Sequence, residues 1–171
     1  MKKIVIVLLV LVLLLSVTAS AETVLFEDYG FFMKLPDDWT YVESEITEEY
    51  EAAGVVYGID AHTEDKSIVM WLEIYAFSEE SVAATDLSLI EFEGHLSDMQ
   101  EYYRDYFPDM SYFAVNGVPF IYYTSADDDG AYLTAYTWTS SHQFGFVFFA
   151  EEMTSDVRTV IAEIMDSYTA L

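Results

Sequence analysis

The sequence predicts an α+β fold, in which an antiparallel β-sheet built from hairpins has helices packed on both faces as an α-β-α sandwich. Three observations predict it. Runs of β-branched and aromatic residues recur between short turns, two segments have the periodicity of amphipathic helices, and one strand is apolar on both sides. A strand of that last kind usually lies in a sheet covered on both faces.

The chain beyond residue 22 begins with a predicted hairpin. Residues 24–26 and 31–35 are its apolar strands, and the turn Leu35-Pro36-Asp37-Asp38-Trp39 closes it. Proline ends a ladder because it has no N–H to donate. These strands are expected to share one sheet with the strands that follow. Residues 43–51 are largely acidic and indicate either a short helix or a solvated loop.

Two longer strands are predicted at residues 54–61 and 67–77, joined by a short polar connection. The second has two largely apolar faces, with Glu73 as a lone charge. A helix against the sheet follows, with the capping-box pair Ser88 and Glu91 or Asp86 at its start, and Pro108 at its end. Its apolar stripe consists of Phe92, Leu96, Met99, Tyr103, Tyr106 and Phe107.

The C-terminal third contains the strongest strand signals. Residues 110–115 form a short strand before Asn116-Gly117, a dipeptide typical of a type I′ hairpin turn. Residues 118–149 then read as a three-run β-meander. Thr154 or Ser155 caps a last helix with a second apolar stripe. That stripe consists of Val157, Ile161, Ile164, Met165 and Tyr168. With no internal repeat, residues 22–171 are predicted to form a single domain.

Residues 1–21 are predicted to be a secretory signal peptide. Lys2 and Lys3 precede the uninterrupted apolar run Ile4–Leu15, and Ala19-Ser20-Ala21 forms a cleavage site after Ala21. The run is shorter than the roughly 20 residues that span a bilayer. We therefore expect a secreted or extracytoplasmic protein without stable membrane association after cleavage.

Acidity is the strongest compositional bias. Removal of residues 1–21 leaves four basic residues against 31 acidic ones, a net charge near −27. This charge argues against nucleic-acid binding, keeps an aromatic-rich domain soluble and favours a partner with a basic surface. Cysteine is absent, so the core must stabilise the exported domain without disulfides.

No catalytic constellation can be assembled from the sequence. There is no thiol and no Gly-x-Ser-x-Gly elbow, and His62, His95 and His142 are isolated from one another. No zinc motif can be drawn with them. Paired carboxylates leave a secreted hydrolase as an alternative, but no particular residues stand out as catalytic.

The run Asp127-Asp128-Asp129-Gly130 is a candidate metal site. A cation such as Ca²⁺ would relieve the repulsion among three adjacent carboxylates, with the affinity of about 10⁻⁴ to 10⁻³ M found in extracellular modules. Asp-Gly is also an ordinary hairpin turn, and the alternating ligands and distal glutamate of an EF-hand are absent. A calcium-binding extracellular module is therefore a further alternative; no other cofactor is expected.

Tyr132, Tyr136 and Trp138 share one face of a predicted strand. If no helix covers that face, it offers an apolar surface for a protein or glycan partner. If a helix does cover it, the three rings belong to the core, where aromatic cross-strand pairs stabilise the sheet.

The order of elements resembles the PsbP-like superfamily, including its bacterial DcrB-like exported relatives. The resemblance rests on the Leu35–Trp39 turn, the midchain helix, the turn Val115-Asn116-Gly117-Val118-Pro119, the meander and the terminal helix. It implies an α-β-α sandwich and a binding or accessory role without catalytic machinery. Plant photosystem members dock and retain ions through particular surface residues, but no matching motif occurs here. The sequence therefore favours an exported, non-enzymatic accessory or binding domain at the cell envelope.

Overall fold

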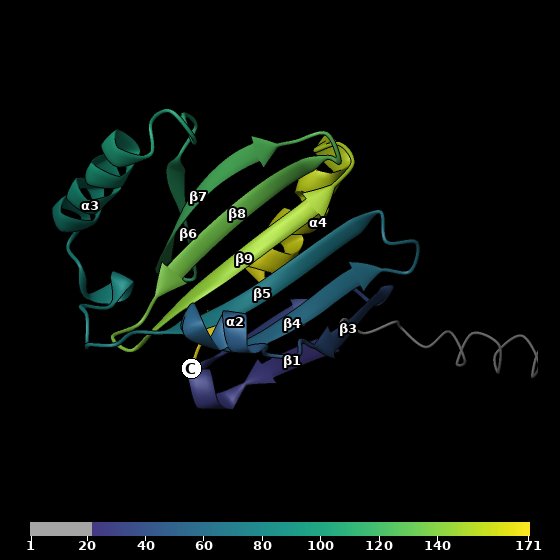
Figure 1. Cartoon of the computed structure of the whole chain (residues 1–171), viewed down its shortest axis with the longest axis horizontal. Coiled ribbons are helices and arrows are strands. Elements are labelled where there is room, and N and C mark those ends of the chain that lie inside the picture. The colour runs from purple at the N-terminus through teal and green to yellow at the C-terminus, as the bar shows by residue number, and fades with distance from the viewer. Residues whose placement is uncertain (1–21) are drawn as a thin grey trace, which may run out of the picture.

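The computed structural model describes residues 22–171, and it confirms the predicted α+β class with antiparallel sheets. The main sheet has seven strands in the order β3-β4-β5-β9-β8-β7-β6. Figure 1 shows this sheet face-on. In chain order its strands are β3 (Trp39–Glu43), β4 (Val55–Thr63), β5 (Ile68–Ala76), β6 (Ser111–Val115), β7 (Val118–Ala126), β8 (Ala131–Trp138) and β9 (His142–Ala150). The predicted signal peptide lies outside the described residues.

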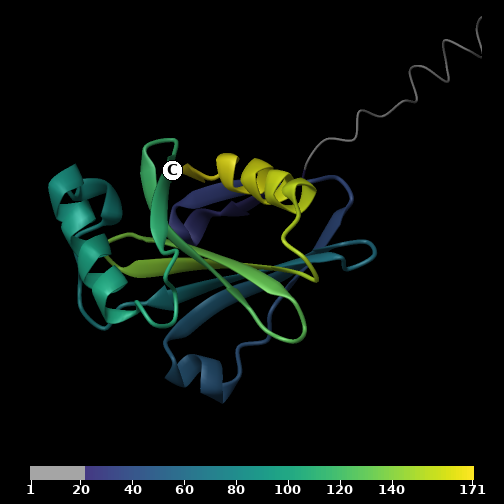
Figure 2. The ribbon, with the colours of Figure 1, turned by 90° about the horizontal axis from the view of Figure 1, so that it is seen from above.

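Helices lie on both faces of the seven-stranded sheet. Helix α4 (Ser155–Asp166) packs on one face, and helices α2 (Glu48–Ala52) and α3 (Leu89–Tyr102) lie on the other. The edge view separates these layers, with α4 above the sheet and α2 below it (Figure 2). Among residues 22–171, none of the helices combines the length and apolarity needed to cross a membrane.

The prediction that the N-terminal strands share the main sheet was wrong. Strands β1 (Glu22–Phe26) and β2 (Phe31–Leu35) pair with β10 (Thr169–Ala170) in a separate three-stranded sheet. Their hairpin is closed by the turn at residues 27–30, whereas Pro36 to Asp38 carry the chain from this sheet into β3. The sequence near β2 does not indicate this arrangement, because β10, which pairs with β2, is only two residues long and lies at the other end of the chain.

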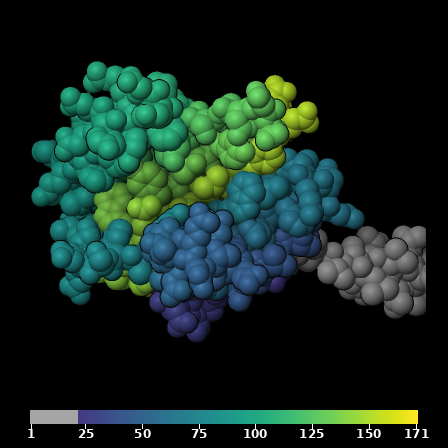
Figure 3. Space-filling view, in the orientation of Figure 1, coloured from purple at the N-terminus to yellow at the C-terminus, as the bar shows by residue number. Residues whose placement is uncertain are grey.

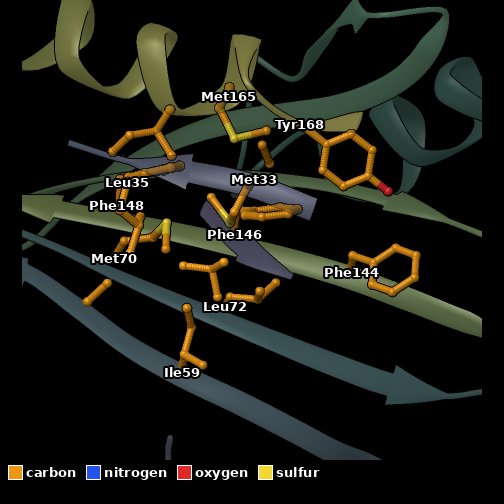
Figure 4. Close-up of a cluster of buried hydrophobic side chains, with 14 of the residues drawn as sticks. Met33, Leu35, Ile59, Met70, Leu72, Phe144, Phe146, Phe148, Met165 and Tyr168 are labelled. Carbon is orange, nitrogen blue, oxygen red and sulfur yellow. The ribbon is translucent and has the colours of Figure 1, made fainter. Parts of the chain in front are cut away.

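The main core fills the space between the seven-stranded sheet, α4 and the three-stranded sheet. The close-up shows Met33 and Leu35 of β2 and Met165 of α4 above the inward side chains of β4, β5 and β9 (Figure 4). The rings of Phe144, Phe146 and Phe148 are fully buried in this layer. This packing stabilises the domain without disulfides, as the absence of cysteine requires.

A second, smaller core lies beneath α3 on the opposite face. Phe92 and Leu96 of the helix pack against Ile121, Tyr136 and Trp138 of the sheet. The other buried members are Ala84 and Met110.

The predicted start of α3 is confirmed, but its end is not. Both hydrogen bonds of the Ser88–Glu91 capping box are present. The helix ends at Tyr102, before Pro108, and Tyr106 is 75% exposed instead of joining the apolar stripe. Tyr103 and Phe107 still pack against the core from the turns that follow the helix.

Several local predictions agree with the structure. Asn116 and Gly117 have φ values of 50° and 84°, as a type I′ turn requires. The Asn116 side-chain amide also donates to the Tyr168 carbonyl at 2.7 Å, which ties this hairpin to the C-terminal end of α4. Thr154 caps α4. The acidic segment at residues 43–51, for which both a loop and a helix were considered, contains most of the short helix α2.

Candidate functional site

Part of the sheet face that carries α2 and α3 is not covered by either helix. Strand β5 was expected to be covered on both sides, yet Val69, Trp71 and Tyr75 are only half-buried. We call this region the open face. The space-filling view shows it as a hollow between α3 and α2, floored by β8 and β9 (Figure 3). Its residues, in strand order, are Gly58, Asp60, His62, Val69, Trp71, Glu73, Tyr75, Tyr132, Thr134, Gly145, Val147 and Phe149.

An aromatic triad lies on the open face. Phe149 of β9 stands between Tyr132 of β8 and Trp71 of β5, with ring centroids 5.1 and 6.4 Å away. The strand register explains the grouping, because Tyr132 is directly opposite Phe149, and Trp71 is opposite Val147, two residues along the same face. Cross-strand aromatic contacts of this kind hold the rings in a fixed arrangement.

The acidic turn after β7 adjoins this triad. A Cβ atom at Gly130 would lie 2.6 Å from the Phe149 ring, so the turn packs directly against that side chain and requires glycine there. The pKa of Tyr132 is raised, mainly by desolvation and further by the nearby negative charge of Asp127. Two candidate sites that the sequence placed separately therefore lie side by side.

The Asp127 carboxylate is engaged within its own turn. One of its oxygens accepts from the backbone amides of Asp129 and Gly130 at 2.9 and 3.1 Å. Among residues 22–171, no group of three or more histidine or carboxylate side chains is arranged to hold a metal ion. The calcium site at Asp127, Asp128 and Asp129 stays a prediction.

The three aromatic residues singled out on β8 have different surroundings. Tyr136 and Trp138 are 9% and 8% exposed beneath α3. The Tyr136 hydroxyl donates to the Met99 sulfur at 2.8 Å, and the Trp138 indole donates to the Val82 carbonyl at the same distance. Tyr132, which lies beyond the end of the helix, is half-buried and belongs to the open face.

A pocket lies at the α2 end of the open face. We call it the α2 pocket; its volume is about 240 Å³. Its walls come from the segment between β3 and α2, from α2 itself and from the outer side of β4 and β5. Six of the lining residues carry the argument below: Glu45, Tyr50, Gly58, Asp60, Trp71 and Glu73.

Glycines on both sides of Glu73 open the sheet surface around it. Glu73 is opposite Gly58 of β4 and Gly145 of β9. A Cβ atom at Gly58 would approach Ser44 to 3.3 Å, so glycine also lets the segment before α2 cross closely, where the Ser44 amide donates to the Gly58 carbonyl at 2.9 Å. The Tyr75 hydroxyl donates to Glu73. Burial, followed by this contact with Glu73, raises the pKa of Tyr75, so the hydroxyl stays protonated as a donor.

The sequence did not identify the α2 pocket. The sequence marks Glu73 only as a lone charge, and no local pattern connects it with Asp60 or Trp71. Their juxtaposition depends on the register of β4 on β5, which pairs Asp60 with Trp71. The one sequence feature that indicates the pocket is an acidic residue, Glu73, in the middle of a strand that is apolar on both faces. Because an unpaired buried charge is costly, such a residue must reach solvent or a partner.

The histidines do not converge on the open face. His95 lies on α3 against the Trp138 ring, at 5.2 Å, and His142 contacts Tyr29 at 5.4 Å on the other side of the sheet. His62 is on β4, where its Nδ1 lies 2.8 Å from the Thr63 carbonyl oxygen. The α2 pocket therefore brings together carboxylates and aromatic rings, a combination suited to binding a positively charged group.

Comparison with known proteins finds similarity in structure but not in sequence. No protein-family model matches the sequence, and no curated protein matches it either. A crystal structure from Bacteroides thetaiotaomicron is similar, with a TM-score of 0.51 and 15% identity over 83% of this chain. The chain spans only 45% of that protein's length.

Cyanobacterial PsbP (CyanoP) of Synechocystis sp. PCC 6803 is similar over nearly its whole length. The match covers 91% of this chain and 95% of that protein, with a TM-score of 0.56 and 13% identity. At this identity the likeness concerns the fold. Together with the antiparallel sheet and its helices on both faces, it establishes that the chain has a PsbP-like fold.

Proposed function

We propose that this chain is an exported, non-enzymatic accessory domain that binds a protein partner through the open face. The observation that carries the proposal is the aromatic triad of Trp71, Tyr132 and Phe149, half-buried on a sheet face that two helices border but do not cover. Half-buried aromatic rings on a rigid sheet are typical anchors of protein interfaces, because they are already ordered before binding.

Export is supported by the N-terminal sequence. Lys2 and Lys3, the apolar run and the small residues before Glu22 have the order of a signal peptide. In an expression host with a secretory pathway, we expect mass spectrometry of the exported chain to give an N-terminus at Glu22. A chain that retains Met1 in the cytoplasm would contradict export.

The charge distribution supports a basic partner. Within residues 22–171, no lysine or arginine occurs in the seven strands of the main sheet, and the open face carries Asp60 and Glu73 beside its apolar side chains. Asp127 and Asp129 border the triad on its other side. A partner with apolar side chains flanked by lysine or arginine complements this pattern, and opposite charge accelerates its association. A neutral saccharide can donate hydrogen bonds to these carboxylates but has no charge to attract them.

A hydrolase is less well supported by the same geometry. The α2 pocket contains carboxylates but no histidine. A carboxylic acid that serves as a general acid near neutral pH is kept protonated by an apolar enclosure. Asp60 and Glu73 are instead half-exposed in an open pocket.

The docking proposal can be tested by NMR titration of ¹⁵N-labelled residues 22–171. The probes are a short peptide in which arginine alternates with leucine, the same peptide with glutamate in place of arginine, and chitohexaose. We expect only the arginine peptide to shift amide resonances, with the changes grouped in β5, β8 and β9. Shifts caused by chitohexaose on the open face would instead indicate a glycan-binding domain and would overturn the protein-partner proposal.

Two variants with the same added charge separate docking from general attraction. Val147→Arg places a long cation in the centre of the open face, whereas Thr159→Arg places it on the exposed side of α4. We expect Val147→Arg to weaken peptide binding at least about tenfold by blocking the contact surface and repelling arginine. Thr159→Arg should change it by less than about twofold, as a remote surface substitution does. Equal losses would show non-specific attraction and contradict the proposal.

A further inference from the structure

The geometry points to the α2 pocket as the receptor for one arginine side chain of the partner, whose guanidinium group binds Asp60 and Glu73 and stacks on Trp71. This inference rests on the proposed function and deepens it. It assigns the positive charge of the partner to a defined place at one end of the open face and names the chemical group that fills it.

The size of the pocket favours a single side chain. Its volume of about 240 Å³ is below the roughly 300–1,000 Å³ of pockets that enclose drug-sized ligands. It also opens onto the triad side of the sheet, because Trp71 belongs to both the pocket wall and the triad. A peptide lying across the triad can therefore place one side chain in the pocket without leaving the sheet surface.

The lining favours an organic cation. Carboxylates alone would not single out this place, since the chain has 31 acidic residues. What distinguishes the pocket is that Glu45, Asp60 and Glu73 line it together with the rings of Tyr50 and Trp71, and without lysine or arginine. Within residues 22–171 the carboxylates are not gathered closely enough to hold a metal ion. A larger, delocalised cation can interact with separated carboxylates and with an aromatic face at the same time.

Arginine satisfies this lining better than lysine does. Its planar guanidinium has five N–H donors, pairs with carboxylates in a two-bond geometry and stacks on tryptophan, whereas the lysine ammonium is a compact, strongly hydrated point charge. The Glu73 carboxylate is also held in place by the Tyr75 hydroxyl, which leaves less side-chain entropy to lose on binding.

The test uses N-acetyl-arginine methylamide as the probe, with the corresponding citrulline amide as an uncharged control of nearly the same shape. We expect the arginine amide to shift the Trp71 indole N–H resonance and the backbone amides of Asp60 and Glu73 in NMR spectra, and the citrulline amide to shift none of them. Binding of both amides with equal affinity would overturn the inference.

Removal of one negative charge at different places provides the matched comparison. We expect Glu73→Gln to weaken binding of the arginine amide about tenfold, within the range for loss of a charged hydrogen-bonding partner. Glu79→Gln removes the same charge from an exposed loop outside the pocket and should change binding by less than about twofold. Equal effects of the two variants would overturn the assignment, provided that both retain the amide spectrum of the folded chain.

The outcomes separate this inference from the proposed function. If the arginine-leucine peptide docks on β5, β8 and β9 while Glu73→Gln and Glu79→Gln weaken it equally, docking stands and the arginine receptor is wrong. If the arginine amide binds at Trp71 while the peptide ignores Val147→Arg, the receptor stands and docking through the open face is wrong.

Discussion

Replacement of Phe31 by alanine is expected to lower the free energy of unfolding by about 3 to 5 kcal/mol, the usual range for truncating a buried phenylalanine. Phe31 is fully buried where the three-stranded sheet meets the main core. Its ring lies 4.5 Å from Phe26, 4.9 Å from Phe144 and 5.1 Å from Tyr168, measured between centroids. These partners come from β1, β9 and the segment after α4, so one substitution creates a cavity where three parts of the chain meet.

Urea unfolding of residues 22–171 measures this loss. A domain of this size has a total stability of about 5–15 kcal/mol, so the variant should have a much lower urea midpoint or be partly unfolded without urea. Leu25→Ala is the matched control, because Leu25 lies in the same small sheet but is 51% exposed. We expect the control to change stability by no more than about 0.5 kcal/mol. Similar losses in both variants would mean that the three-stranded sheet is not an integral layer of the core.

The three-stranded sheet also illustrates why the sequence predicts individual strands better than it predicts how strands assemble into sheets. The Asn116-Gly117 turn, the Ser88–Glu91 box and the Thr154 cap are short-range signals, and the structure contains all three. One of the two partners of β2 is the strand Thr169–Ala170, more than 130 residues away. Neither a turn residue nor an alternating pattern near Thr169 indicates this pairing. Register between distant strands is set by which faces can be buried together, and no single segment of the sequence contains that information.

The candidate site shows the same division between local and long-range information. The acidic turn and Tyr132 were each identified from their own segments, but their contact depends on Gly130 packing against Phe149 of the next strand. How much of the sheet remains open depends on where α3 docks. Its apolar stripe predicts a helix against the sheet but not which strands the helix covers, and the structure places it over β6, β7 and β8.

The position of α3 leads to the second large effect. Phe92→Ala is expected to lower the stability of the α3 region by about 3 to 5 kcal/mol. Phe92 is 2% exposed, stacks on Trp138 at 5.9 Å and meets Tyr112 edge-on at 5.5 Å. An isolated helix of this length is marginal in water, so α3 depends on this docking contact for its own stability. Native-state hydrogen exchange measures the effect, and we expect amides of α3 to exchange much faster while those of β5 and β9 stay protected.

Gly94→Ala provides a control of opposite sign on the same helix. A Cβ atom at Gly94 would meet nothing within 4 Å, so alanine should strengthen α3 by about 0.5 to 1 kcal/mol through helix propensity alone. In the double variant with Phe92→Ala, Gly94→Ala should restore part of the helical stability of α3 but not its contact with Trp138. Helix propensity affects formation of the helix, whereas Phe92 affects its packing on the sheet. Equal loss of protection in α3, β5 and β9 would contradict this separation and show that the two cores unfold as one unit. If the separation holds, undocking of α3 uncovers Tyr136 and Trp138 next to Tyr132, so the helix limits the extent of the surface available to a partner.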